Sequence, residues 1–146
     1  MLSNRKRTFL FFTGLIGLFI LALSFMYFTP KTYPDTPNGQ VPNEYATVKS
    51  APDALIIVHK AGCQHCQQAS KTIVPALDSS KNQKRPVLVI ESTNEHQKVS
   101  EGNSYPDILT DYGISRYPTI LHLKNGTVVG RYTGTNVQQL KAILNS

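Results

Sequence analysis

The chain has only two cysteines among its 146 residues, Cys63 and Cys66, and just Gln64 and His65 separate them. The apolar run Leu55 to Val58 precedes them, and a helical pattern follows. A Cys-x-x-Cys at a strand-to-helix junction is typical of a redox dithiol. The free N–H groups and partial positive charge of a helix N-terminus favour a thiolate, the species that attacks disulfides. We therefore expect Cys63 to be the nucleophile and Cys66, one turn later, the resolving thiol.

The dipeptide between the cysteines is expected to tune the thiolate. A positive imidazole on His65 near Cys63 would stabilise the thiolate, favour the reduced form and make the disulfide a better oxidant. This favours an oxidising or isomerising role, with a reducing role as the alternative. Gln64, the other residue between the cysteines, is also expected to tune the stability of the thiolate. A solvent-exposed His65 with little electronic effect is the structural alternative.

Zinc binding is the rival chemistry, because His59, Cys63, His65 and Cys66 are close in sequence. A structural zinc site usually takes four ligands from two separated pairs, and the sequence holds no second pair. We therefore expect no metal and no cofactor, the redox group being the Cys63–Cys66 disulfide itself. Carboxylates paired for hydrolysis, a nucleophile-elbow motif and phosphate-binding glycine loops are absent from the sequence.

The charge of the chain is unevenly distributed. Arg5, Lys6 and Arg7 supply three charges of the formal +6, and residues 31–146 carry twelve basic and nine acidic residues. That surface is mildly basic and has no run of like charges, so nucleic-acid binding is not expected.

An uncharged stretch of twenty residues, Phe9 to Phe28, follows the basic cluster. As a helix at about 1.5 Å per residue it would span roughly 30 Å, the thickness of a bilayer core. Basic residues tend to stay in the cytoplasm, so residues 1–8 are expected inside and the rest outside. The sequence thus predicts a transmembrane anchor, or uncleaved signal, over residues 9–28. A signal peptide cleaved after Ala22-Leu23-Ser24, giving a secreted form, is the alternative.

The remaining chain divides into a tether and a folded part. Residues 29–52 contain five prolines among polar residues, which predicts an extended, proline-rich tether. Hydrophobic periodicity in residues 53–146 predicts strands and helices in alternation, closed by an Asn-Gly hairpin. The expected strands are 55–60, 86–91, 119–123 and 128–133, and the expected helices are 64–80, 105–112 and 136–144. This order predicts an α/β fold with a mixed four-stranded sheet and helices on both faces.

The second half of the folded part carries a further pattern: Tyr112-Gly113-Ile114, then Tyr117-Pro118-Thr119, then Lys124-Asn125-Gly126, then Gly134. Together with the dithiol, this pattern resembles the thioredoxin-like superfamily over about residues 50–146. The resemblance implies a thioredoxin-like fold in which Pro118 forms a cis-proline loop beside the dithiol. It also implies that Tyr117, the preceding residue, presents its backbone to a bound substrate strand.

Several residues depart from the thioredoxin pattern. Gly62 replaces a tryptophan, Gln64-His65 replaces Gly-Pro, and Ile57 stands where thioredoxins carry a buried acid that aids proton transfer at the second cysteine. The family's first strand–helix pair is expected to be shortened or lost, because only the proline-rich segment precedes Leu55. With these departures, the chain resembles the extracytoplasmic, membrane-tethered members of the superfamily. Those members include disulfide oxidoreductases and accessory proteins for exported peptides such as bacteriocins.

The sequence therefore predicts a membrane-anchored, extracytoplasmic thiol-disulfide oxidoreductase that acts as a monomer. Its expected partners are thiols and disulfides of exported proteins or peptides and a membrane or extracytoplasmic electron partner. The alternative is an accessory or binding module that uses the scaffold to hold an exported peptide, without redox turnover of the dithiol.

Overall fold

The computed structural model describes residues 4–28, 31–79, 82, 84–93 and 107–146. The chain divides into two units, residues 1–30 and residues 31–146, and each is described by itself.

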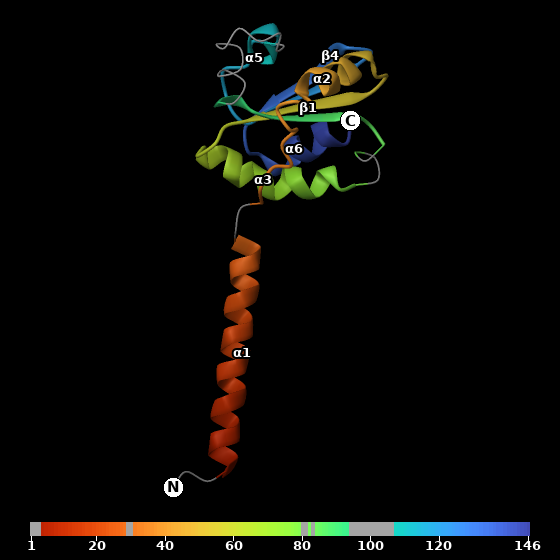
Figure 1. Cartoon of the computed structure of the whole chain (residues 1–146). Coiled ribbons are helices and arrows are strands. Elements are labelled where there is room, and N and C mark those ends of the chain that lie inside the picture. Colours follow the sequence, from red (N-terminus) through yellow and green to blue (C-terminus); the bar gives the residue numbers. More distant parts are fainter. Residues whose placement is uncertain (1–3, 29–30, 80–81, 83, 94–106) are drawn as a thin grey trace. The chain divides into compact units, whose positions relative to one another are not determined.

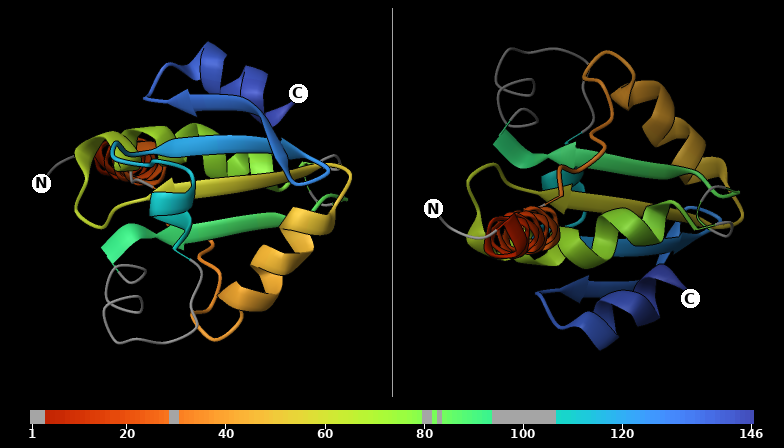
Figure 2. Two further views of the ribbon diagram at one scale, coloured as in Figure 1. Left: turned by 90° about the horizontal axis from the view of Figure 1, so that it is seen from above. Right: turned by 90° about the horizontal axis from the view of Figure 1, so that it is seen from below.

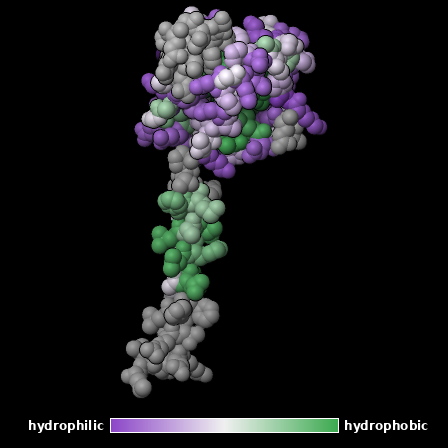
Figure 3. Space-filling model, viewed as in Figure 1, coloured by the Kyte–Doolittle hydropathy of each residue, from purple (hydrophilic) through white to green (hydrophobic). Residues whose placement is uncertain are grey.

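The first unit is a single helix, α1 (Asn4–Phe28), of 25 residues (Figure 1). Large apolar side chains on its described part are exposed, and they form the hydrophobic surface of this unit in Figure 3. A helix over this stretch was expected from the sequence. No helix in the described part of the chain meets the length and hydropathy that a membrane crossing requires, and the anchor predicted over residues 9–28 stays a prediction.

The second unit is built on a mixed four-stranded sheet with the order β2-β1-β3-β4 (Figure 2). β1 pairs with β2 in parallel and with β3 antiparallel, and β3 pairs with β4 antiparallel. The predicted sheet is confirmed, and each strand begins and ends within one residue of its expected bounds. The strands are β1 (Ala54–His59), β2 (Val87–Glu91), β3 (Thr119–Lys124) and β4 (Thr127–Thr133).

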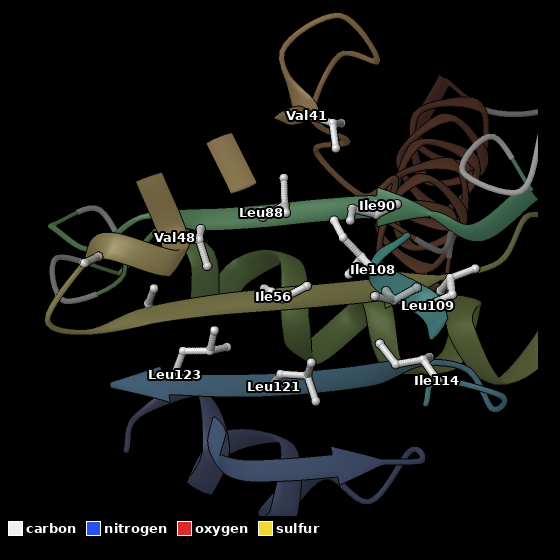
Figure 4. Close-up of a cluster of buried hydrophobic side chains, with 13 residues drawn as sticks. Val41, Val48, Ile56, Leu88, Ile90, Ile108, Leu109, Ile114, Leu121 and Leu123 are labelled. Atoms are coloured by element: carbon white, nitrogen blue, oxygen red, sulfur yellow. The ribbon is translucent and has the colours of Figure 1, made fainter. Parts of the chain in front are cut away.

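Helices cover both faces of the sheet, as expected (Figure 1). On one face, α3 (Gln64–Leu77) and α6 (Val137–Leu144) pack over alternate β1 residues such as Leu55 and Ile57. On the other face, α2 (Val41–Ser50) and α5 (Ile108–Asp111) enclose the cluster drawn in Figure 4. All six β1 residues are buried, because this central strand is covered on both faces. The predicted start of α5 at 105 lies outside the described residues.

The expected tether is wrong for residues 31–52, which belong to the second unit. Val41 and Val48, seven residues apart on one face of α2, are 1% and 0% exposed. Pro42 lies in the first helical turn, where its missing N–H costs no hydrogen bond. A proline-rich segment can therefore contain the start of a helix. Here α2 forms within the segment that the sequence predicted to be an extended tether.

The Asn-Gly hairpin between β3 and β4 is confirmed. Asn125 and Gly126 have φ values of 49° and 74°, the left-handed conformation of a two-residue hairpin. The turn also contacts the C-terminal end of α2, since the Asn125 N–H donates at 3.1 Å to the carbonyl of Ala51, the residue that caps this helix. A Cβ on Gly126 would lie 2.5 Å from the backbone oxygen of Lys49. The hairpin thus needs glycine both for its turn and for the docking of α2.

A polar cluster around the buried side chains of His122 and Arg85 joins the sheet to the C-terminal end of α6. His122 Nε2 lies 2.6 Å from Asp53 Oδ1, and Arg85 donates to the Leu144 carbonyl at 2.5 Å and approaches Asp53 at 3.4 Å. Burial alone would raise the pKa of Asp53, but the His122 hydrogen bond and the Arg85 charge lower it. Asp53 is therefore ionised in the folded chain, and it counters the buried guanidinium.

Candidate active site

The dithiol lies where β1 meets α3, as the sequence predicts. A tight turn follows His59, with the Cys63 N–H donating to the Lys60 carbonyl at 3.3 Å. Gly62 has a φ of 69°, a left-handed conformation that side chains disfavour, which accounts for glycine at this position. Cys63 is the N-cap of α3, and its Sγ accepts the N–H of Cys66 at 3.2 Å. Capping at a helix N-terminus stabilises negative charge on this sulfur.

The two cysteines are free thiols in unequal environments. Cys63 is partly exposed, whereas Cys66 is 2% exposed and packs among the apolar residues beneath α3. Burial raises the pKa of Cys66 to about 12, and its hydrogen bond to Cys63 adds to the shift. Cys66 thus carries its proton and donates to Cys63 Sγ at 2.7 Å. This arrangement gives one accessible acceptor sulfur and one buried donor thiol.

The loop before β3 completes the site. The Tyr117–Pro118 bond is cis, as expected from the resemblance, and Pro118 is buried. The Tyr117 carbonyl oxygen lies 4.0 Å from Cys63 Sγ, so two segments 54 residues apart meet at the nucleophile. Thr119 Oγ1 donates to the Arg116 carbonyl at 2.7 Å, which stabilises the turn. Backbone atoms of Tyr117 therefore border any sulfur that reaches Cys63.

The two residues between the cysteines, Gln64 and His65, face solvent. Within the described residues, no hydrogen bond or ion pair holds the His65 ring, and none joins it to Cys63. The tuning role assigned to both residues stays a prediction. In the same described part, no three His, Cys, Asp or Glu side chains are grouped as a metal site.

Sequence reasoning missed Tyr33 and gave His59 no role. The Tyr33 hydroxyl donates to the Cys66 carbonyl at 2.9 Å, and its ring stacks on His59 with centroids 4.1 Å apart. His59 Nε2 in turn lies 2.5 Å from Asp35 Oδ1. Tyr33 is separated from Cys66 by 33 positions, and no local pattern reveals such a contact. The available signal was an aromatic residue in an otherwise polar segment.

Comparisons with known proteins agree with this architecture. No protein-family model matches the chain. The chain is 28% identical over 93 residues to the "Probable protein disulfide-isomerase ER-60" of Schistosoma mansoni, a match that covers 63% of this chain and 17% of that protein. The chain therefore spans only about a sixth of that relative's length.

Solved structures resemble the chain more extensively. The thioredoxin of Malassezia sympodialis has a TM-score of 0.61 at 16% identity, covering 80% of this chain and 91% of that one. Trxlp of Edwardsiella tarda has a TM-score of 0.56 at 19% identity, and the match covers 75% of this chain and 95% of that one. Mitochondrial thioredoxin 3 of Saccharomyces cerevisiae has a TM-score of 0.53 at 16% identity, and the match covers 72% of this chain and 89% of that one. Together with the strand order, these likenesses define a thioredoxin-like α/β fold.

Proposed function

We propose that the chain is a thiol-disulfide oxidoreductase that uses Cys63 and Cys66. The observation that carries the proposal is the pairing of a partly exposed, helix-capping sulfur with a buried, protonated thiol 2.7 Å away. The cis Tyr117–Pro118 loop beside Cys63 supports it, because it offers backbone groups to a substrate strand. The likeness to thioredoxins and to a disulfide-isomerase relative is consistent with this class of chemistry.

The exchange proceeds in two displacements. The Cys63 thiolate attacks a substrate disulfide R–S–S–R′, forms a Cys63–S–S–R bond and releases R′–S⁻, which takes a proton from water. Cys66 then attacks Cys63 Sγ, and its proton passes to the departing R–S⁻. The Cys63–Cys66 disulfide forms, and R–SH leaves. The substrate gains two electrons and two protons, and the dithiol loses them. Oxidation of a substrate dithiol follows the same steps in reverse.

The direction of electron flow is proposed from the residues flanking the dithiol. Ile57 replaces the buried acid and His65 replaces the proline of the thioredoxin pattern, which favours an oxidising or isomerising enzyme. The reduction potential of the Cys63–Cys66 couple, measured against glutathione, tests this direction. A value near about −120 mV supports an oxidant, whereas one near about −270 mV supports a reductant.

The location is proposed from the sequence of the first unit. The uncharged run of residues 9–28, the preceding basic cluster and the exposed apolar side chains of α1 favour a membrane anchor with residues 31–146 outside the cytoplasm. The partners would then be exported proteins or peptides and an electron partner at the membrane. Alkaline extraction of membranes tests this, with wild type expected in the pellet.

Charge substitutions make the location test specific. Leu18→Arg with Leu21→Arg should release the chain, since each arginine costs about 2.5–3.5 kcal/mol at a helix centre in the membrane. Thr32→Arg with Asn38→Arg adds the same charge outside the run and should leave the chain in the pellet. Release of wild type, or retention of the Leu18 and Leu21 double variant, would refute the anchor.

Insulin reduction with dithiothreitol, followed by turbidity, tests the enzymatic proposal. Wild type should accelerate it, and Cys63→Ser should abolish the acceleration because no thiolate attacks. Cys66→Ser should also block turnover, but it should accumulate a mixed disulfide at Cys63 that is visible on a non-reducing gel. Activity that persists in Cys63→Ser, or a wild type without activity in both directions, would rule the proposal out and favour a peptide-holding module.

A further inference from the structure

The segment of residues 33–36, here called the strap, lies along the outer edge of β2, the edge strand of the sheet. It is fixed to β2 by two hydrogen bonds, from the Thr36 N–H to the Val89 carbonyl at 2.9 Å and from the Val89 N–H to Thr36 Oγ1 at 3.3 Å. Two strap side chains point to the site, Tyr33 to Cys66 and Asp35 to His59. The strap is thus anchored to the sheet and contacts the end of β1 and the start of α3.

Tyr33 packs in the same part of the core as the resolving cysteine. Its side chain belongs to the same buried cluster as Cys66 and is 8% exposed. Its hydroxyl donates to the Cys66 carbonyl, which lies in the first turn of α3. Burial raises the pKa of Tyr33, and negative charge on Cys66 and then on Cys63 raises it further. Tyr33 therefore stays protonated and acts as a hydrogen-bond donor, never as a base.

His59 fixes the orientation of the Tyr33 ring. The two rings are nearly parallel, with an interplanar angle of 9°, and His59 is itself held by Asp35. The strap residues at positions 33 and 35 thus contact one histidine from its face and from its edge. This double contact restricts the orientation of the Tyr33 ring, whose hydroxyl donates to the Cys66 carbonyl.

Among the described residues, no buried Asp or Glu side chain lies near Cys66. Ile57 is fully buried and lies on the same face of β1 as His59, and the buried polar residues of the described segments include no Asp or Glu. Cys66 therefore shares its buried cluster with the Tyr33 ring and the Ile57 side chain, and no described carboxylate is buried there to attract water. An apolar cover keeps a thiol neutral.

We propose that Tyr33 is a positioning residue for the resolving cysteine: its ring excludes water from Cys66 Sγ and its hydroxyl holds the first turn of α3. Cys66 thereby stays a protonated thiol while Cys63 is the only sulfur that attacks substrate. The inference rests on the proposed exchange function and concerns its second displacement. In the thioredoxin pattern, a buried acid aids proton transfer at the second cysteine. Here the strap, which lies outside the helices and strands, would set the protonation of Cys66.

Alkylation of Cys66 tests the water-excluding ring without any need for turnover. In the full chain carrying Cys63→Ser, the rate of reaction with iodoacetamide is measured from pH 7 to 11. Adding Tyr33→Ala should raise the rate at pH 8 about tenfold or more, because the reagent gains access to the sulfur and each unit of pKa lowering increases the thiolate about tenfold, of which weaker nucleophilicity offsets about threefold. The pH profile should move to lower pH. Tyr33→Phe should change the rate less than about threefold, since the ring remains.

Tyr45→Ala is the matched control, because Tyr45 packs on the opposite face of the same sheet and donates to Asp111. It should leave Cys66 alkylation unchanged even where it lowers the melting temperature. An increase in Tyr33→Ala no larger than in Tyr45→Ala would overturn the inference. If Tyr33→Ala fails to fold, the hydroxyl is tested alone in Tyr33→Phe.

The hydroxyl has a separate readout in the intact dithiol. Tyr33→Phe should slow the release of a mixed disulfide preformed on Cys63 by roughly threefold to tenfold, as expected for loss of one buried hydrogen bond. Formation of the same mixed disulfide should keep its wild-type rate. Equal release from wild type and Tyr33→Phe would overturn the role of the hydroxyl. Wild type without any exchange activity would instead overturn the proposed function, whatever the alkylation rates show.

Discussion

At pH 8, alkylation of the reduced wild-type chain should be almost confined to Cys63. The structure gives Cys66 a pKa of about 12, because burial removes solvation from its thiolate and Cys63 accepts its proton in a hydrogen bond. At pH 8 such a thiol is about 0.01% ionised, whereas an ordinary cysteine with a pKa of about 8.5 is about one-quarter ionised. The thiolate population thus falls roughly 2,000-fold.

Part of this loss is offset by intrinsic reactivity. A thiolate with a higher pKa is a stronger nucleophile, and a Brønsted coefficient of about 0.4–0.5 over 3.5 units returns a factor of roughly 40. The net prediction is that Cys66 reacts at least roughly 50-fold more slowly than an ordinary cysteine. Burial of the sulfur hinders the reagent further, so this figure is a lower bound.

The same chain unfolded in urea supplies the reference rate, because both cysteines are then ordinary thiols. Brief exposure to iodoacetamide, acid quenching and fragment-ion mass spectrometry separate labels on Cys63 and Cys66. The Cys66 rate in the folded chain should rise about tenfold per pH unit up to about pH 11. A folded-chain rate within a factor of five of the unfolded one, or a plateau below pH 10, would refute the assigned environment of Cys66.

Three further outcomes concern the fold that supports the site. Val48→Ala should lower the free energy of unfolding by about 2–3 kcal/mol in urea titrations, through lost buried methyl groups and a cavity, whereas exposed Val137→Ala should change it little. Gly126→Ala should cost more than about 1–2 kcal/mol. It should also cost more than Gly113→Ala, because both glycines have positive φ but only a Cβ at Gly126 meets a backbone oxygen of α2. Asp53, whose pKa is lowered by folding, should contribute stability that is present above about pH 4 and lost as the pH falls further. Asp53→Asn should therefore flatten the acid limb of a melting-temperature profile, and an unchanged limb would contradict the lowered pKa.

The sheet and the dithiol were predictable because their signals are local. Continuous apolar runs mark buried strands, an Asn-Gly pair marks the hairpin, and only two residues separate Cys63 from Cys66. The cis bond before Pro118 was predictable only through the resemblance to thioredoxins. In each case, a short segment contains most of the interactions that determine its structure.

The strap and α2 were not predictable in the same way. Five prolines in residues 29–52 outweighed the weak helical spacing of Val41 and Val48, although Pro42 is compatible with a first helical turn. Tyr33 has its partners on β1 and α3, so its role depends on tertiary contacts that composition does not encode. For the same reason, His59 looked like an ordinary strand end until Asp35 and Tyr33 were placed around it.

Tyr117 contacts the hydrophobic clusters on both faces of the sheet, in addition to placing its carbonyl near Cys63. The residue that we propose borders the substrate therefore also packs against the hydrophobic clusters on both faces of the sheet. Changes made there to alter substrate choice will also alter core packing on both sides. Attempts to redesign specificity should leave this side chain in place and vary exposed neighbours such as Arg116, which can change charge at the site without loosening the fold.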